Sequence, residues 1–245
     1  MHDLLAVVGL ALAGSVVALV GGLAFLYIKP WSNWLGKYSI PFAAGVLLTV
    51  TLVGLIPEAA ELYGEGAFAI VLVAFVGSYF FENYFTQLHH HDDAHGMKSS
   101  VALVVVGDTI HNLVDGVAIA AAYLINPGVG LITTISTFLH EVPHEVGDFG
   151  VMFKAGWRRR SIVIVNLISA LATVLGAVIV LWVAPSNAVL GVLIAIAAGM
   201  FLYLGASDFL PNIQNGDTPK HKVMAAFLLG IILMYVSAVV IPHAH

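Results

Sequence analysis

The chain of 245 residues contains no cysteine and few charged residues. The absence of cysteine excludes disulfide bonds and thiolate metal sites. Charged side chains make up only 9% of the residues and the formal net charge is −5, which argues against a nucleic-acid partner. Hydrophobic residues make up 60%, and the mean hydropathy is +0.98. A soluble domain of this length does not have such a composition, so the sequence predicts a polytopic membrane protein.

Eight apolar runs are long enough to cross a bilayer, which takes about 20 helical residues. They are residues 4–28, 39–57, 67–87, 99–122, 129–152, 161–183, 188–209 and 223–241. The N-terminal sequence MHDLL has no basic n-region, so we expect the first run to be a retained span rather than a signal peptide. The connections are short. We therefore predict an all-α polytopic membrane protein with eight transmembrane helices in one domain, residues 1–245.

The nine Lys and Arg residues lie only in alternate connections between these runs. They are Lys29, Lys37, Lys98, Lys154, Arg158, Arg159, Arg160, Lys220 and Lys222. Cytoplasmic loops of membrane proteins are enriched in Lys and Arg, so these connections are predicted to be cytoplasmic. Both termini are then expected outside the cytoplasm, in a multi-pass protein of a plasma or inner cell membrane.

Two segments of the chain resemble one another. Residues 43–59 read AAGVLLTVTLVGLIPEA and residues 197–213 read AAGMFLYLGASDFLPNI, with the Ala-Ala-Gly and the Pro at the same spacing. The two copies would cross the membrane in opposite directions. This pattern predicts an inverted repeat of helices 1–3 and 6–8 around central helices 4 and 5, an arrangement that commonly places a binding site near the midplane.

The fifth run contains HEVPHEVGD, residues 140–148, in an otherwise apolar setting. On a helix its five ionisable residues fall within an arc of about 140°. They are His140, Glu141, His144, Glu145 and Asp148. An acidic residue at the bilayer centre costs about 2.5–3.5 kcal/mol, so this face is expected to point away from lipid. Pro143 removes a backbone donor within the helix, where we expect a kink.

The fourth run carries a second polar face in GDTIHNLVDG. Asp108, His111, Asn112 and Asp115 fall within an arc of about 100° by the same helical period. If the two faces meet, they offer the nitrogen and oxygen ligands that a borderline divalent cation prefers. Asp108, Glu145 and Asp148 lie nearer the predicted cytoplasmic side, and we interpret them as residues of a path or as partners that orient the ligands.

The connection at residues 88–98 is rich in histidine and contains QLHHHDDAH. His89, His90, His91 and His95 form a flexible metal-chelating tract in this predicted cytoplasmic loop. We expect it to bind metal in a regulatory role.

The two motifs HNLVDG and HEVPHEVGDF resemble the paired signatures of the ZIP (Zrt/Irt-like) divalent metal transporters. The eight spans, the outside termini, the His-rich loop and the IPEAAE sequence are similar as well, so the resemblance extends over the whole chain. It implies a single transmembrane transporter domain, not an enzyme and without a catalytic cofactor. Its transported substrate would be zinc, or cadmium, iron or manganese, moved into the cytosol. The resemblance further implies a homodimer and an elevator-like motion of helices 1, 4, 5 and 6 against 2, 3, 7 and 8.

The resemblance also implies a binuclear metal site between helices 4 and 5. The ligands of the first metal would be His111, Asp115, His140 and His144. The ligands of the second would be Asn112 and Glu141, with Asp115 and His144 as bridging positions. The chain departs from the pattern of some members: His144 and Thr173 stand where they have Glu, and Leu47 where they have Met. These departures reduce the ligands of the second metal and any preference for soft metals.

Two other functions match the same residues. His140-Glu141-Val142-Pro143-His144 has the HExxH spacing of zinc metalloproteases, some of which work inside membranes, with Glu141 as general base. A passive divalent-metal channel would share every feature of the transporter and differ only in lacking alternating access.

Overall fold

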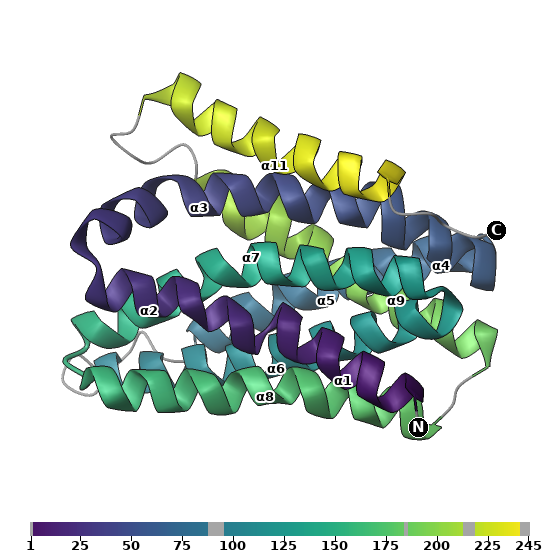
Figure 1. Ribbon diagram of the computed structural model, residues 1–245, viewed down its shortest axis with the longest axis horizontal. Coiled ribbons are helices and arrows are strands. Elements are labelled where there is room, and N and C mark those ends of the chain that lie inside the picture. Colours follow the sequence, from purple (N-terminus) through teal and green to yellow (C-terminus); the bar gives the residue numbers. More distant parts are fainter. Residues whose placement is uncertain (1, 88–95, 184–185, 213–218, 241–245) are drawn as a thin grey trace.

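In the computed structural model, residues 2–87, 96–183, 186–212 and 219–240 are described, and every regular element in these ranges is helical (Figure 1). The elements are α1 His2–Gly14, η1 Val16–Ala18, α2 Leu19–Tyr27, α3 Lys29–Thr49, η2 Val50–Leu55, α4 Ile56–Tyr63, α5 Gly66–Gln87, α6 Gly96–Ile125, α7 Pro127–Lys154, α8 Arg159–Val183, α9 Asn187–Tyr203, η3 Leu204–Phe209, α10 Leu210–Asn212 and α11 Lys220–Val240. The prediction of an all-α polytopic membrane protein is confirmed.

Seven helical segments among the described residues are long and apolar enough to cross a membrane. The remaining predicted span, 129–152, corresponds to α7. This helix has 28 residues, or about 42 Å at 1.5 Å per residue, which exceeds the bilayer core of about 30 Å. Its acidic and histidine residues lower its mean hydropathy, so α7 is not among the seven membrane-spanning candidates. The count of eight spans therefore stays a prediction.

The first span is broken near its middle, contrary to the single run expected over 4–28. α1 ends at Gly14, and a 3₁₀ turn over Val16–Ala18 leads into α2. Ser15 lies at the break, and its hydroxyl donates to Asn112 Oδ1 on α6 at 2.8 Å and contacts the Ala170 carbonyl on α8 at 3.0 Å. These contacts tie the break to α8 and to α6, which carries one of the two polar faces.

The second helix begins earlier than expected. The predicted connection over 29–38 is helical, because α3 starts at Lys29 with Pro30 in its first turn, where proline needs no intrahelical partner. Trp31 and Trp34 on this extension are exposed, as is Tyr27 just before it. Exposed aromatic side chains beside basic residues are typical of a membrane–water interface.

The two ends of the bundle differ in charge. α1 begins and α11 ends at one end of the bundle, on the right of Figure 1, whereas the α2–α3 and α7–α8 turns lie at the other. These two turns carry Lys29 and Arg158–Arg160. The alternation of basic connections in the sequence is therefore reproduced in space. Which side of the membrane the basic end faces remains the prediction made from the positive-inside rule.

Helix packing divides the bundle into two groups. In one group α6 packs on α8 and α7, and α1 and α2 pack on α7. In the other, α3 packs on α11, and α5 and α4 pack on α9. A satellite core of Leu19, Leu26, Phe149, Met152 and Ile162 lies within the first group. The groups meet where α3 contacts α7 and where α9 contacts α6.

The two similar sequence segments share a backbone irregularity. Each contains a six-residue π-helix, η2 and η3, at the same interval after the Ala-Ala-Gly. A Cβ at Gly45 would lie 2.2 Å from the Phe227 carbonyl on α11, and one at Gly199 would lie 2.5 Å from the Val71 carbonyl on α5. Both glycines thus allow close helix pairs. These matches support the predicted repeat, and its inverted symmetry stays a prediction.

α6 and α8 approach through two reciprocal glycines. A Cβ at Gly116 would lie 1.8 Å from the Thr173 carbonyl, and one at Gly176 would lie 2.1 Å from the Leu113 carbonyl. No side chain fits between backbones this close, so glycine is required at both positions. The contact sets the position of α6, which carries half of the polar residues.

Candidate metal site

The site is built on the hairpin formed by α6 and α7. The two helices are joined at Asn126, whose side chain accepts a hydrogen bond from Gly128 N at 2.7 Å and caps α7, while Pro127 occupies the first turn. Such a short connection makes the helices antiparallel neighbours. Their polar faces, predicted from the helical period, therefore lie opposite one another along the hairpin.

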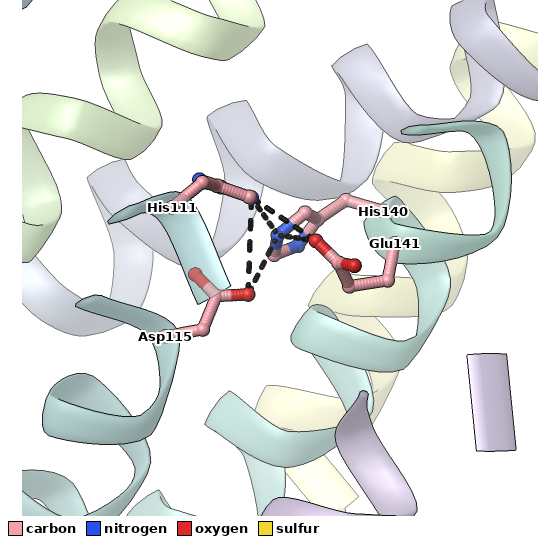
Figure 2. Close-up of side chains that lie close together, drawn as sticks. All are labelled: His111, Asp115, His140 and Glu141. Atoms are coloured by element: carbon pink, nitrogen blue, oxygen red, sulfur yellow. Dashed lines mark hydrogen bonds and ion pairs between the residues drawn. The ribbon is translucent and has the colours of Figure 1, made fainter. Parts of the chain in front are cut away.

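Four side chains bring their donor atoms together in what we call the first ligand group: His111, Asp115, His140 and Glu141 (Figure 2). His140 Nε2 lies 3.2 Å from His111 Nε2, 3.2 Å from Asp115 Oδ2 and 3.8 Å from Glu141 Oε1. His111 Nε2 lies 3.1 Å from Glu141 Oε1 and 3.9 Å from Asp115 Oδ2. Tetrahedral zinc with bonds of about 2.0–2.1 Å needs donors roughly 3.3–3.4 Å apart. The donor separations fit such an ion.

The backbone sets the tautomer of His140. Its Nδ1 lies 2.8 Å from the Ser136 carbonyl oxygen one turn earlier, which can only accept a hydrogen bond. Nδ1 therefore carries the proton, and in the neutral ring Nε2 has a free lone pair that points at the other three donors. Metal-binding histidines are commonly oriented in this way by a backbone carbonyl.

The carboxylates of the first ligand group are buried without hydrogen-bond partners. Asp115, His140 and Glu141 have no solvent-exposed surface, and none of the four carboxylate oxygens has a hydrogen bond. Burying two carboxylates beside each other is costly, and a divalent cation coordinated by these oxygens would compensate their charge. Phe201 of α9 covers this end of the site, with its ring centroid 5.2 Å from that of His140.

His144, Asp108 and Asp148 form a separate cluster, which we call the second ligand group. His144 Nδ1 lies 3.7 Å from Asp108 Oδ1 and 3.8 Å from Asp148 Oδ2. The structure thus brings Glu141, rather than His144, to the donors that the resemblance assigns to the first metal. The His144 ring stacks on His111 with centroids 5.0 Å apart, so the two groups are adjacent.

Asn112 lies in neither group. Its Oδ1 accepts hydrogen bonds from Ser15 Oγ at 2.8 Å and from Thr173 Oγ1 at 2.9 Å. Its Nδ2 donates to Asp108, to the backbone oxygen at 3.1 Å and to Oδ1 at 3.0 Å. Asn112 therefore links η1, α6 and α8, and all its carboxamide contacts are to protein groups.

The other predicted residues are placed as follows. Glu145 is buried, neither of its carboxylate oxygens has a hydrogen bond, and it belongs to neither ligand group. α7 continues through Pro143, and the expected kink stays a prediction. The His-rich tract, His89, His90, His91 and His95, lies outside the described residues.

Three contributors were not predicted: Ser15, Ser136 and Phe201. Ser15 interrupts an apolar run next to Gly14, a signal visible in the sequence but without an identifiable partner there. Ser136 acts through its backbone carbonyl, which no side-chain pattern reveals. Phe201 lies on α9, far from both motifs in the sequence, and only the tertiary fold brings it to His140.

Fold and site together define a class: a polytopic helical membrane protein with a largely buried set of two imidazoles and two carboxylates, which suits a borderline divalent cation. Residues 87–238, well over half of the chain, match the family described as ZIP Zinc transporter. The chain belongs to this family, and the resemblance drawn from the two motifs is confirmed.

Curated relatives in animals carry zinc-transporter names. The chain is 41% identical over 128 residues to zinc transporter ZIP10 of Danio rerio, covering 52% of this chain and 15% of the relative. It is 37% identical over 137 residues to zinc transporter foi of Drosophila melanogaster, covering 56% of this chain and 19% of the relative. It is 31% identical over 154 residues to zinc transporter zipt-7.2 of Caenorhabditis elegans, covering 60% of this chain and 33% of the relative. The matches thus span a third or less of these relatives' lengths.

Proposed function

We propose that the chain transports zinc or a similar divalent metal ion across a membrane into the cytosol. The observation that carries this proposal is the first ligand group: four donor atoms, 3.1–3.9 Å apart where measured, from three buried side chains and the partly buried His111, on two adjacent helices. The relatives' names and the family membership support zinc. Cadmium, iron and manganese suit the same ligands, so they are included as candidate substrates.

The ion's route follows from the polar side chains along the hairpin. The ion binds at the first ligand group, then passes His144 and Asp148. Their side chains are 20% and 13% exposed, against 12% at His111 and none at the three other members of the first ligand group. Exposure therefore increases toward the end of the bundle that carries the basic residues. Because the positive-inside rule makes that end cytoplasmic, the proposed direction is inward.

Alternating access would occur by an elevator-like movement of one helix group against the other. The packing supports this division, since α1, α2, α6, α7 and α8 form one group and α3, α4, α5, α9 and α11 the other. The ligands lie on α6 and α7 alone, so the ion would move with its group. Phe201 on α9 would then stay behind and uncover His140. The chain is further expected to form a homodimer, as its resemblance to the family implies.

The protease alternative is less well supported. An HExxH site needs both histidines on one zinc, but His140 Nε2 lies in the first ligand group and His144 Nδ1 in the second. Glu141 approaches the histidine donors as a ligand, which leaves no free general base. A passive channel differs in needing no movement of one helix group against the other.

The test is zinc uptake by proteoliposomes that contain a metal-sensitive dye. We expect saturable uptake by the wild-type chain and at least about a tenfold loss in His140→Ala, which removes a donor from the first ligand group. His221→Ala is the matched control, because His221 is exposed at the start of α11 and should leave uptake unchanged. Undiminished uptake by a well-folded His140→Ala protein would contradict the proposed site. Parallel runs with cadmium, iron and manganese would rank the substrates.

A further inference from the structure

The second ligand group contains buried donor atoms that have no hydrogen-bond partner, and His144 Nδ1 lies 3.7 Å from Asp108 Oδ1 and 3.8 Å from Asp148 Oδ2. His144 Nδ1, Asp108 Oδ2 and Asp148 Oδ2 are buried and have no hydrogen-bond partner. Asp108 is only 3% exposed, so solvent does not compensate its carboxylate. One donor atom from each of the three residues lies within 4.8 Å of the others. A buried imidazole and two carboxylates in this arrangement are a ligand set with a formal charge of −2, matched to a divalent cation.

Asn112 holds Asp108 in place for this group. The Asn112 Nδ2 donates to Asp108 Oδ1 at 3.0 Å, and the Asn112 Oδ1 already accepts from the hydroxyls of Ser15 and Thr173. A carbonyl oxygen has two lone pairs, so this oxygen has no lone pair left for a metal. Asn112 is therefore fixed from three sides and acts on a metal only through Asp108.

The second ligand group is suited to release an ion. It offers three donors instead of four, and its His144 and Asp148 side chains are partly exposed. Open coordination positions are filled by water, which lowers affinity and lets the ion leave. Members of the two groups are three to seven residues apart along α6 and three to eight along α7, so the nearest members lie about 4.5 Å, or roughly one helical turn, apart along each helix. The stacked rings of His111 and His144 connect them.

We propose that Asp108, His144 and Asp148 form a second divalent-metal site, separate from the first, which receives the transported ion before release. In this assignment Asn112 is a positioning residue for Asp108 and not a metal ligand. The second site rests on the proposed function for its role in transport, but its ability to bind metal is independent of transport and is tested separately.

The first test counts bound zinc by equilibrium dialysis of the purified full chain in detergent. Every protein in this count, including the one called wild type, carries alanine in place of His89, His90, His91 and His95, because the His-rich tract is itself expected to bind zinc. We expect two ions per wild-type chain and one in Asp148→Ala, with the other ion lost in Asp115→Ala. Glu61→Gln, which changes an exposed acid on α4, should retain both ions. Size-exclusion profiles check folding. One ion in the wild type, or two in Asp148→Ala, would overturn the second site.

The second test uses the absence of native cysteine. A thiolate placed at Asp148→Cys should bind added Cd²⁺ and produce the ultraviolet charge-transfer band of a Cd–thiolate bond, because cadmium favours soft ligands. Gly147→Cys is the matched control, because a Cβ at Gly147 meets nothing within 4 Å. The control should give no band at the same Cd²⁺ concentration. Equal bands in both variants, or none in either, would contradict the assignment.

The role of Asn112 is tested with the same ultraviolet Cd–thiolate band of Asp148→Cys. Adding Asn112→Ala to Asp148→Cys should weaken Cd²⁺ binding at the thiolate about 10- to 100-fold, as expected for loss of a residue that orients a ligand. Zinc binding at the first ligand group should be unchanged by Asn112→Ala. If Asn112 were a ligand there, the same change would weaken zinc binding. Two bound zinc ions without uptake would refute transport and leave the second site standing. Zinc uptake by a chain that binds only one ion would support transport and refute the second site.

Discussion

Replacing Gly116 by alanine tests whether the metal site depends on the close contact between α6 and α8. The added Cβ would lie 1.8 Å from the Thr173 carbonyl oxygen. Non-bonded heavy atoms prefer separations of about 3.5 Å or more, so the two helices would have to part by roughly 1.7 Å at this point. Both partners are helix backbone, which cannot rotate away as a side chain could.

The expected consequences are loss of stability and loss of metal binding. Overpacking costs about 1–3 kcal/mol, of which about 1 kcal/mol is regained because alanine favours helix over glycine. Gly116 is the residue next to Asp115 on α6, and a metal site tolerates errors of only about 0.2 Å in its ligand distances. We therefore expect a lower midpoint of thermal unfolding in detergent, and zinc uptake reduced at least about tenfold.

Gly107→Ala is the matched control in the same helix, since a Cβ there meets nothing within 4 Å. It should keep uptake and be neutral or more stable by up to about 1 kcal/mol. Gly176→Ala should reproduce the Gly116→Ala defect, and the double variant should be little worse than either, because both glycines serve one contact. If Gly116→Ala behaved like Gly107→Ala in both assays, the proposed dependence of the site on this contact would be refuted.

Two further predictions concern the ligands and the residues around them. Zinc at 100 times its dissociation constant should stabilise the folded chain by about 2.7 kcal/mol, measured as a shift in thermal unfolding, and a shift of equal size in His140→Ala would contradict the role of His140 as a ligand. The double variant Ser15→Ala/Thr173→Val leaves Asn112 Oδ1 buried without a donor and should lose about 1–3 kcal/mol in the same assay. Ser78→Ala, which removes a hydroxyl that donates to the Ala74 carbonyl in its own helix, is the comparison, and equal losses in the two proteins would contradict the importance of the Asn112 contacts.

The membrane class, the helical content and the two helices that carry the site follow from the sequence alone. Each depends on local properties: apolar runs of spanning length, and polar residues that recur at the helical period. His111, Asp115, His140 and Glu141 were all identified as candidate ligands because a face of a helix can be read from one chain segment. The repeat with its matching prolines was visible for the same reason.

Only the tertiary structure divided the polar residues between two ligand groups. The helical period gives the face of each residue, but the depth at which α6 faces α7 depends on the Asn126 turn and on the glycine contacts with α8. That alignment places Glu141 beside His111, and His144 beside Asp108. It also engages Asn112 with Ser15 and Thr173, which lie 97 and 61 residues away in the chain. Contacts over such separations depend on how helices pack, and no local sequence pattern contains that information.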